Sequence, residues 1–142
     1  MIDKTERLFV ILLRLSAGVL LLAFPAAFLP IGWMQAIHRW LHLGELPDQP
    51  IIAYLTRSLS GMYGIHGLLL LFASFDVRRY LPLLRFALVI SLLGGVALLL
   101  IDLAAGMPWF WTWSEGPSLI VFYGVLAGLA ARLPDKKTAR SD

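Results

Sequence analysis

Apolar residues occur in four long runs separated by short polar stretches. The runs cover residues 8–29, 51–75, 81–103 and 117–133, and none alternates between apolar and polar positions. A helix needs about 20 mostly apolar residues to cross the roughly 30 Å hydrocarbon core of a bilayer. Open sheets are excluded there because their edge groups would lack hydrogen-bond partners in lipid. The pattern therefore predicts four transmembrane helices, of which the last is the shortest.

Two of the connecting stretches have their own apolar pattern. In residues 31–43, helical spacing places Trp33, Ile37 and Trp40 on one face with Met34 and Leu41, opposite Gln35, His38, Arg39 and His42. This arrangement predicts an amphipathic helix lying flat at the membrane interface. Residues 104–116 contain three tryptophans within five residues, as in the aromatic belt at headgroup level. We expect this stretch to be a loop that precedes a helix beginning at residue 117.

Composition agrees with a membrane protein. Of 142 residues, 59% are hydrophobic and 15% are charged, more apolar surface than so short a soluble chain could bury. The absence of cysteine excludes disulfides, thiol catalysis and cysteine-based metal sites.

We predict an all-α membrane protein with four transmembrane helices in an up-down bundle plus the interfacial helix. Residues 1–133 would form this single domain, and residues 134–142 a disordered cytoplasmic tail. The first run is longer than the apolar region of a signal peptide, so a retained anchor is expected.

The net charge of +3 does not indicate nucleic-acid binding, because the basic residues lie at the ends of the apolar runs rather than along a stripe. Two basic residues, Arg39 and Arg57, fall on one side of the predicted bundle. Ten fall on the other: Lys4, Arg7, Arg14, Arg78, Arg79, Arg85, Arg132, Lys136, Lys137 and Arg140. The positive-inside rule then predicts a bacterial inner-membrane protein with both termini in the cytoplasm.

Arg57 and Asp102 are the deepest oppositely charged residues, one in the second run and one near the end of the third. Side chains lean toward the N-terminus of their helix, so in antiparallel helices these two lean toward each other. Charges in hydrocarbon are usually paired or functional. We predict an Arg57–Asp102 pair, with Glu115 just ahead of the fourth helix as a second acceptor. Two alternatives are that the pair only joins two helices, or that Arg57 extends to the headgroups.

Small residues share faces with these charges. Gly61 and Gly64 follow Arg57 at helical spacing, and Gly95 precedes Asp102. Gly124 and Gly128 form a GxxxG motif in the fourth run. Small residues permit close helix packing in lipid, either within the chain or in a homo-oligomer.

Histidines suggest no cofactor or metal centre. His66 is an intramembrane residue, typical of a hydrogen-bonded packing position, with a haem or metal ligand or a proton relay as alternatives. No second histidine lies at a similar depth to complete a bis-histidine haem site. His38 and His42 have the spacing of a zinc pair but lack the glutamate of a zincin motif.

Two stretches resemble the DoxX-like group of small four-helix bacterial membrane proteins. In the first run, Leu13-Arg14-Leu15 is followed by Gly18, and residues 67–74 (GLLLLFAS) lead into a short charged loop. The resemblance covers about half of the chain. It implies a four-helix membrane fold, and quinone-linked redox chemistry is known for some members.

The sequence favours a non-enzymatic or accessory membrane protein with a polar and aromatic pocket in the outer leaflet. Its predicted ligand-binding residues are Arg57, Asp102, Glu115, Trp109, Trp111 and Trp113, with His66 as a separate polar position. The expected partners are membrane lipids, a lipid or quinone headgroup, a second copy of the chain or a partner's transmembrane helix. The alternatives are an enzyme acting on a lipid-soluble substrate, with a carboxylate as acid or base, and a purely structural assembly factor.

Overall fold

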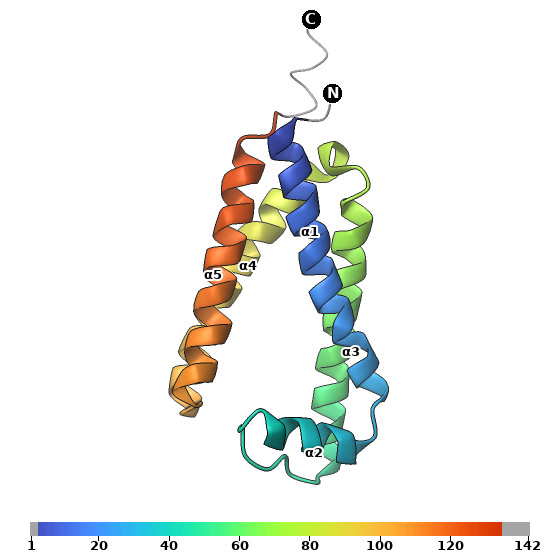
Figure 1. Ribbon diagram of the computed structural model, residues 1–142, viewed down its shortest axis with the longest axis vertical. Helices are drawn as coiled ribbons and strands as arrows, with labels where there is room; N and C mark the ends of the chain where they lie inside the picture. The colour runs from blue at the N-terminus through green and yellow to red at the C-terminus, as the bar shows by residue number, and fades with distance from the viewer. Residues whose placement is uncertain (1–2, 135–142) are drawn as a thin grey trace, which may run out of the picture. The chain divides into compact units, whose positions relative to one another are not determined.

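A computed structural model describes residues 3–134, and all regular elements in this range are helices. In chain order they are α1 (Lys4–Leu22), the 3₁₀ helix η1 (Phe24–Phe28), α2 (Ile31–Trp40), α3 (Pro50–Ala73), α4 (Val77–Ala105) and α5 (Trp109–Ala131) (Figure 1). The prediction of an all-α protein is confirmed for these residues. The predicted tail lies outside them, apart from Pro134.

Three segments are long and apolar enough to cross a membrane. They are Lys4–Phe28, which joins α1 and η1, together with α4 and α5. Helix α3 has 24 residues, but its middle carries Arg57, His66 and several hydroxyl side chains, which make it less apolar. Three of the four predicted spans therefore have the length and hydropathy of transmembrane helices. The α3 span stays a prediction, as does the arrangement of four helices in one bundle.

The start of the last helix was predicted wrongly. Helix α5 begins at Trp109, so the three tryptophans lie in its first turns and Glu115 lies inside the helix, not ahead of it. Pro108 precedes the helix, and its carbonyl accepts the backbone N–H groups of Trp111 and Thr112. The predicted start was Pro117, the first residue of the fourth apolar run. Here it lies within α5, and the 23-residue helix is long enough to cross a bilayer.

The ends of α4 and α2 also differ from the predicted ends. Helix α4 begins four residues before the predicted residue 81, because the Asp76 carboxylate accepts the backbone N–H of Arg79 and caps the helix (3.1 Å). Its last residue is Ala105, and the next residue, Gly106, has a φ of 66°, which suits glycine. The Gly106 N–H bonds to the carbonyls of Asp102 and Leu103. The predicted amphipathic helix is present as α2, three residues shorter than expected because His42 has a positive φ of 56°, and its position at the membrane interface stays a prediction.

The chain divides into two compact units. Among the described residues, unit 1 contains residues 3–13, at the start of α1, and residues 73–134; unit 2 contains residues 14–72.

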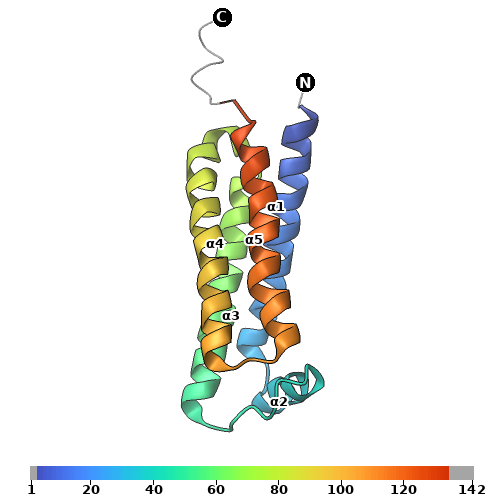
Figure 2. The same cartoon turned by 90° about the vertical axis from the view of Figure 1, so that its left-hand side faces the viewer.

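In unit 1, α4 and α5 pack against each other as an antiparallel pair and are seen side by side in Figure 2. The buried residues of α4 include Leu81, Leu88, Gly95 and Asp102, which are seven residues apart. Those of α5 include Gly116, Tyr123 and Ala130, again at intervals of seven. This repeat is the seam of two helices packed at a shallow angle. The two helices approach closely at Gly95 and Gly116, where a Cβ on Gly116 would lie 3.0 Å from the Gly95 carbonyl oxygen.

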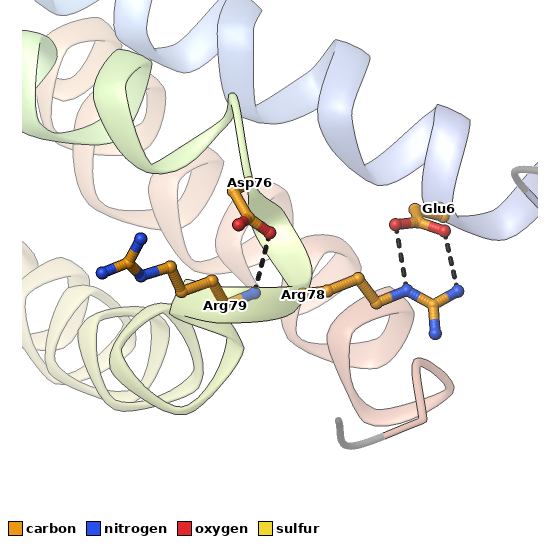
Figure 3. Close-up of polar contacts among 4 residues, drawn as sticks. All are labelled: Glu6, Asp76, Arg78 and Arg79. Carbon is orange, nitrogen blue, oxygen red and sulfur yellow. Dashed lines mark hydrogen bonds and ion pairs between the residues drawn. The ribbon is translucent and has the colours of Figure 1, made fainter. Parts of the chain in front are cut away.

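The other end of unit 1 brings the start of α1 to the start of α4 and the end of α5. Its core contains Phe9, Leu13, Leu84 and Leu126, each at most 2% exposed. Arg78 donates two hydrogen bonds to the carboxylate of Glu6, 3.0 Å from Nε and 2.8 Å from Nη2 (Figure 3).

Arg85 has a role that the sequence did not indicate. Its guanidinium donates to the carbonyl of Ala130 (3.1 Å from Nη2) and to that of Leu133 (2.8 Å). The last carbonyls of a helix have no partner within the helix and carry partial negative charge. Arg85 therefore caps the end of α5.

In unit 2, the second part of α1 packs against α3, and α2 lies across the line of these two helices (Figure 1). A Cβ on Gly67 of α3 would lie 2.9 Å from the carbonyl oxygen of Ala17, so the two backbones approach closely. Met34 is the buried residue of α2, whereas Trp33 and Trp40 are exposed.

Candidate functional site

Asp102 is the most unusual polar residue in unit 1. It lies in the last turn of α4, at a position of the seven-residue repeat that Leu81, Leu88 and Gly95 occupy nearer the start of the helix. Its side chain is 5% exposed, and within residues 3–134 its Oδ2 atom has no hydrogen-bond partner. A buried polar atom without a partner costs on the order of 1–3 kcal/mol, and more when it is charged. The seam thus contains a carboxyl group that needs a donor.

Thr112 does not supply that donor. It is 3% exposed and lies four residues before Gly116 on the buried face of α5. Its hydroxyl donates to the carbonyl of Pro108, the residue that precedes its helix (3.4 Å). Sequence reasoning missed Thr112, although its spacing from Gly116 and Tyr123 would have placed it on the packed face.

Glu115 and Trp111 form a local pair on α5. The indole Nε1 of Trp111 donates to Oε2 of Glu115 at 2.7 Å, a bond between residues one helical turn apart. Both side chains are partly exposed. Trp109 and Trp113 are 77% and 65% exposed, so they present their rings outward as aromatic residues at a membrane surface do. The predicted carboxylate and tryptophans thus lie on the same two turns of helix.

The two predicted site residues of unit 2, Arg57 and His66, both lie on α3 but have different surroundings. Arg57 is exposed on α3, and its Nη2 donates to the carbonyl of Leu29, the residue that ends η1 (3.2 Å). His66 is half-buried, nine residues further along α3. The Arg57–Asp102 pair stays a prediction.

Charge is distributed unevenly along unit 1. From residue 86 to residue 131 the chain contains no lysine, arginine or histidine, and Asp102 and Glu115 are its only charged residues. The basic residues Arg78, Arg85 and Arg132 lie at the opposite ends of α4 and α5. The C-terminus of α4 adds partial negative charge close to Asp102. The α4–α5 turn is therefore an acidic end with aromatic residues around it.

Unit 2 contains a small polar depression lined by Gln35, Arg39, Glu45 and Leu46. Near it, His38 Nδ1 lies 3.0 Å from the Gly44 carbonyl oxygen, so this nitrogen is already engaged. Within residues 3–134, no three histidine, aspartate or glutamate side chains are grouped closely enough to hold a metal ion.

Comparison with known proteins found no matching family model, no matching curated protein and no matching solved structure. The resemblance to DoxX-like proteins stays a prediction from the residues that carry it.

The chemistry of the α4–α5 turn is that of an acceptor site. Asp102 and Glu115 offer carboxyl oxygens, the tryptophans offer ring faces, and no basic residue of α4 or α5 lies nearby. Such a site suits a ligand that donates hydrogen bonds or carries positive charge.

Proposed function

We propose that this protein is a multi-pass membrane protein that binds an amphiphile through the α4–α5 turn, with Asp102 as the anchor. The observation that carries this proposal is the carboxyl oxygen of Asp102, buried in a membrane helix without a hydrogen-bond partner among the described residues. A polar group in such a place is rare unless it is paired or functional. An amphiphile satisfies both surroundings, because its headgroup can bond to Asp102 while its tail remains in lipid.

The tryptophans support an amphiphile rather than a water-soluble ligand. Trp109 and Trp113 are exposed next to the site, and an exposed tryptophan favours the boundary between headgroups and acyl chains. This boundary is where the headgroup of a lipid or a quinone lies. The binding function needs no catalytic step, so the protein is proposed as an accessory or carrier protein.

The test is mass spectrometry of small molecules that copurify with the protein in a mild detergent. We expect one amphiphile to be retained by the wild type and its amount to fall at least tenfold in Asp102→Asn, because the anchor loses its charge. Tenfold corresponds to about 1.4 kcal/mol of binding free energy.

The matched control is Asp76→Asn. It makes the same substitution at an aspartate far from the turn, and asparagine still caps a helix, so helix α4 keeps its N-terminal cap. It should retain the wild-type amount of ligand. Equal retention by Asp102→Asn, or a wild type without any amphiphile, would refute the proposed function.

We further propose four spans, with α3 as the fourth, in a bacterial inner membrane and with both termini in the cytoplasm. The ten basic residues assigned to the cytoplasmic side support this orientation. The exposed Trp33, Ile37 and Trp40 of α2 support the proposal that α2 lies in the outer interface, two residues beyond the span Lys4–Phe28.

Single cysteines can test the topology because the chain has none of its own. With four spans, a membrane-impermeant thiol reagent applied to intact cells should label Asp48→Cys and Met107→Cys but not Phe75→Cys. Opening the cells should then expose Phe75→Cys. If α3 does not cross, positions 48 and 75 will be labelled from the same side and position 107 from the other.

A further inference from the structure

The ligand class of the α4–α5 turn follows from its charge and from the unsatisfied oxygen. Resting on the proposed amphiphile-binding function, we infer that the ligand headgroup is a primary ammonium, held by Asp102 and Glu115. A headgroup that only accepts hydrogen bonds, such as a quinone, cannot bond to an ionised carboxylate, which has no proton to donate.

Positive charge is favoured by two features of this end of unit 1. Both charged residues between positions 86 and 131 are acidic, so no basic residue of this range opposes them. Asp102 also lies in the last turn of α4, where the helix carries partial negative charge. Electrostatic attraction is strong in this region because lipid and protein screen charge poorly compared with water. An alcohol could donate a hydrogen bond to Asp102 but would gain none of this attraction.

A primary rather than a quaternary ammonium is indicated by the state of Asp102. Its Oδ2 needs an N–H or O–H donor, and a primary ammonium has three N–H groups whereas a trimethylammonium has none. Charge-assisted hydrogen bonds are roughly twice as strong as neutral ones. The ring of Trp111 is held close to Glu115 by their 2.7 Å hydrogen bond and can add a cation–π contact.

Access to Asp102 requires a small local movement. Its Oδ2 is covered by protein atoms, so the ammonium reaches it only when side chains at the turn move aside. The turn of residues 106–108 is short, and Trp109 beside it is largely exposed. Glu115, which is partly exposed, would meet the headgroup first, and Asp102 would hold it.

Three probes that share one long alkyl chain test this inference: a primary amine, its trimethylammonium analogue and the corresponding alcohol. Their dissociation constants are measured on the detergent-purified protein by tryptophan fluorescence and by native mass spectrometry. We expect the amine to bind at least tenfold more tightly than either analogue. Asp102→Asn should remove this preference, and Asp76→Asn should keep it.

A second variant keeps the test decisive if Asp102→Asn does not fold. Glu115→Gln retains a carbonyl oxygen for the Trp111 indole and removes only the charge. It should weaken amine binding several-fold while the alcohol is unaffected.

Nanodiscs distinguish a lipid headgroup from a free amine. Retention of phosphatidylethanolamine over phosphatidylcholine would identify the phospholipid as the source of the ammonium. Binding of the alkylamine without such retention would indicate a free long-chain amine.

Four results of the binding measurements would overturn the inference. Two are equal binding of the alcohol and the amine, and equal binding of the trimethylammonium probe and the amine. A third is amine binding that does not change in either acidic variant, which would be partitioning into the micelle. The fourth is amine binding that occurs only in Arg57→Leu, because the cation that satisfies Asp102 would then be Arg57 of the chain itself. If an amphiphile that depends on Asp102 copurifies but carries no amine, the proposed function stands and this inference fails.

Discussion

Gly116→Ala is expected to destabilise the α4–α5 pair by about 1–3 kcal/mol, the range for overpacking a close-packed interior. A Cβ at this position would lie 2.8 Å from the Leu99 Cβ and 3.0 Å from the Gly95 carbonyl oxygen. Neither atom is the end of a flexible side chain, so the added methyl group must push the two helices apart. In lipid no hydrophobic effect drives the helices back together, and the lost close contact is not recovered.

Two matched variants in α4 provide smaller expected losses of stability for comparison. Gly95→Ala should cost less, because the backbone atoms nearest its Cβ position, the Gly116 carbonyl oxygen and the Ile120 nitrogen, are 3.3 Å away, and only Cγ1 of Ile120, at 2.9 Å, is closer. Gly94→Ala is the control in the same helix, since no atom lies within 4 Å of its Cβ position and alanine favours helix over glycine. When unfolding is measured in detergent, the loss of stability should be largest for Gly116→Ala, smaller for Gly95→Ala and smallest for Gly94→Ala. A Gly116→Ala protein as stable as Gly94→Ala would contradict the packing described for this seam.

The Glu6–Arg78 ion pair is expected to give the second large effect on stability. Glu6→Gln and Arg78→Met should each lower the free energy of unfolding by about 1–2 kcal/mol. A typical surface ion pair contributes up to about 1 kcal/mol to stability. The Glu6–Arg78 pair should contribute more, because its hydrogen bonds are bidentate and the Glu6 side chain is only 12% exposed. The 35% exposure of the Arg78 side chain keeps the expectation below that for a fully buried pair.

A double-mutant cycle measures the coupling. The double variant should be more stable than the sum of the single losses predicts, by about 1 kcal/mol. Arg79→Ala is the control: it removes the neighbouring guanidinium, while the backbone N–H that completes the Asp76 cap remains (Figure 3). It should change stability by less than about 0.5 kcal/mol. Additive losses at Glu6 and Arg78 would show that the start of α1 and the start of α4 are not joined by this contact.

Long apolar runs were sufficient to predict helices and their approximate order. The length of each run is the reason. In lipid, a run of about 20 apolar residues can form all its backbone hydrogen bonds within one segment only as a helix. The same reasoning located α2 from Trp33, Ile37 and Trp40, since helical spacing alone separates its apolar from its polar side. It also selected Asp102 and Glu115, because a carboxyl group within or beside an apolar run is unusual wherever the chain folds.

Helix ends and side-chain partners depended on tertiary structure. Pro117 is compatible with a helix start or with a helix interior, and only the backbone bonds to Pro108 show that α5 begins eight residues earlier. Arg85 caps α5 through Ala130 and Leu133, which are 45 and 48 residues away, a contact that no local pattern encodes. The unsatisfied oxygen of Asp102 is likewise a property of packing. Sequence alone determined that this chain places an acid in a membrane helix, and only the packing of α4 decided that the acid is buried without a donor.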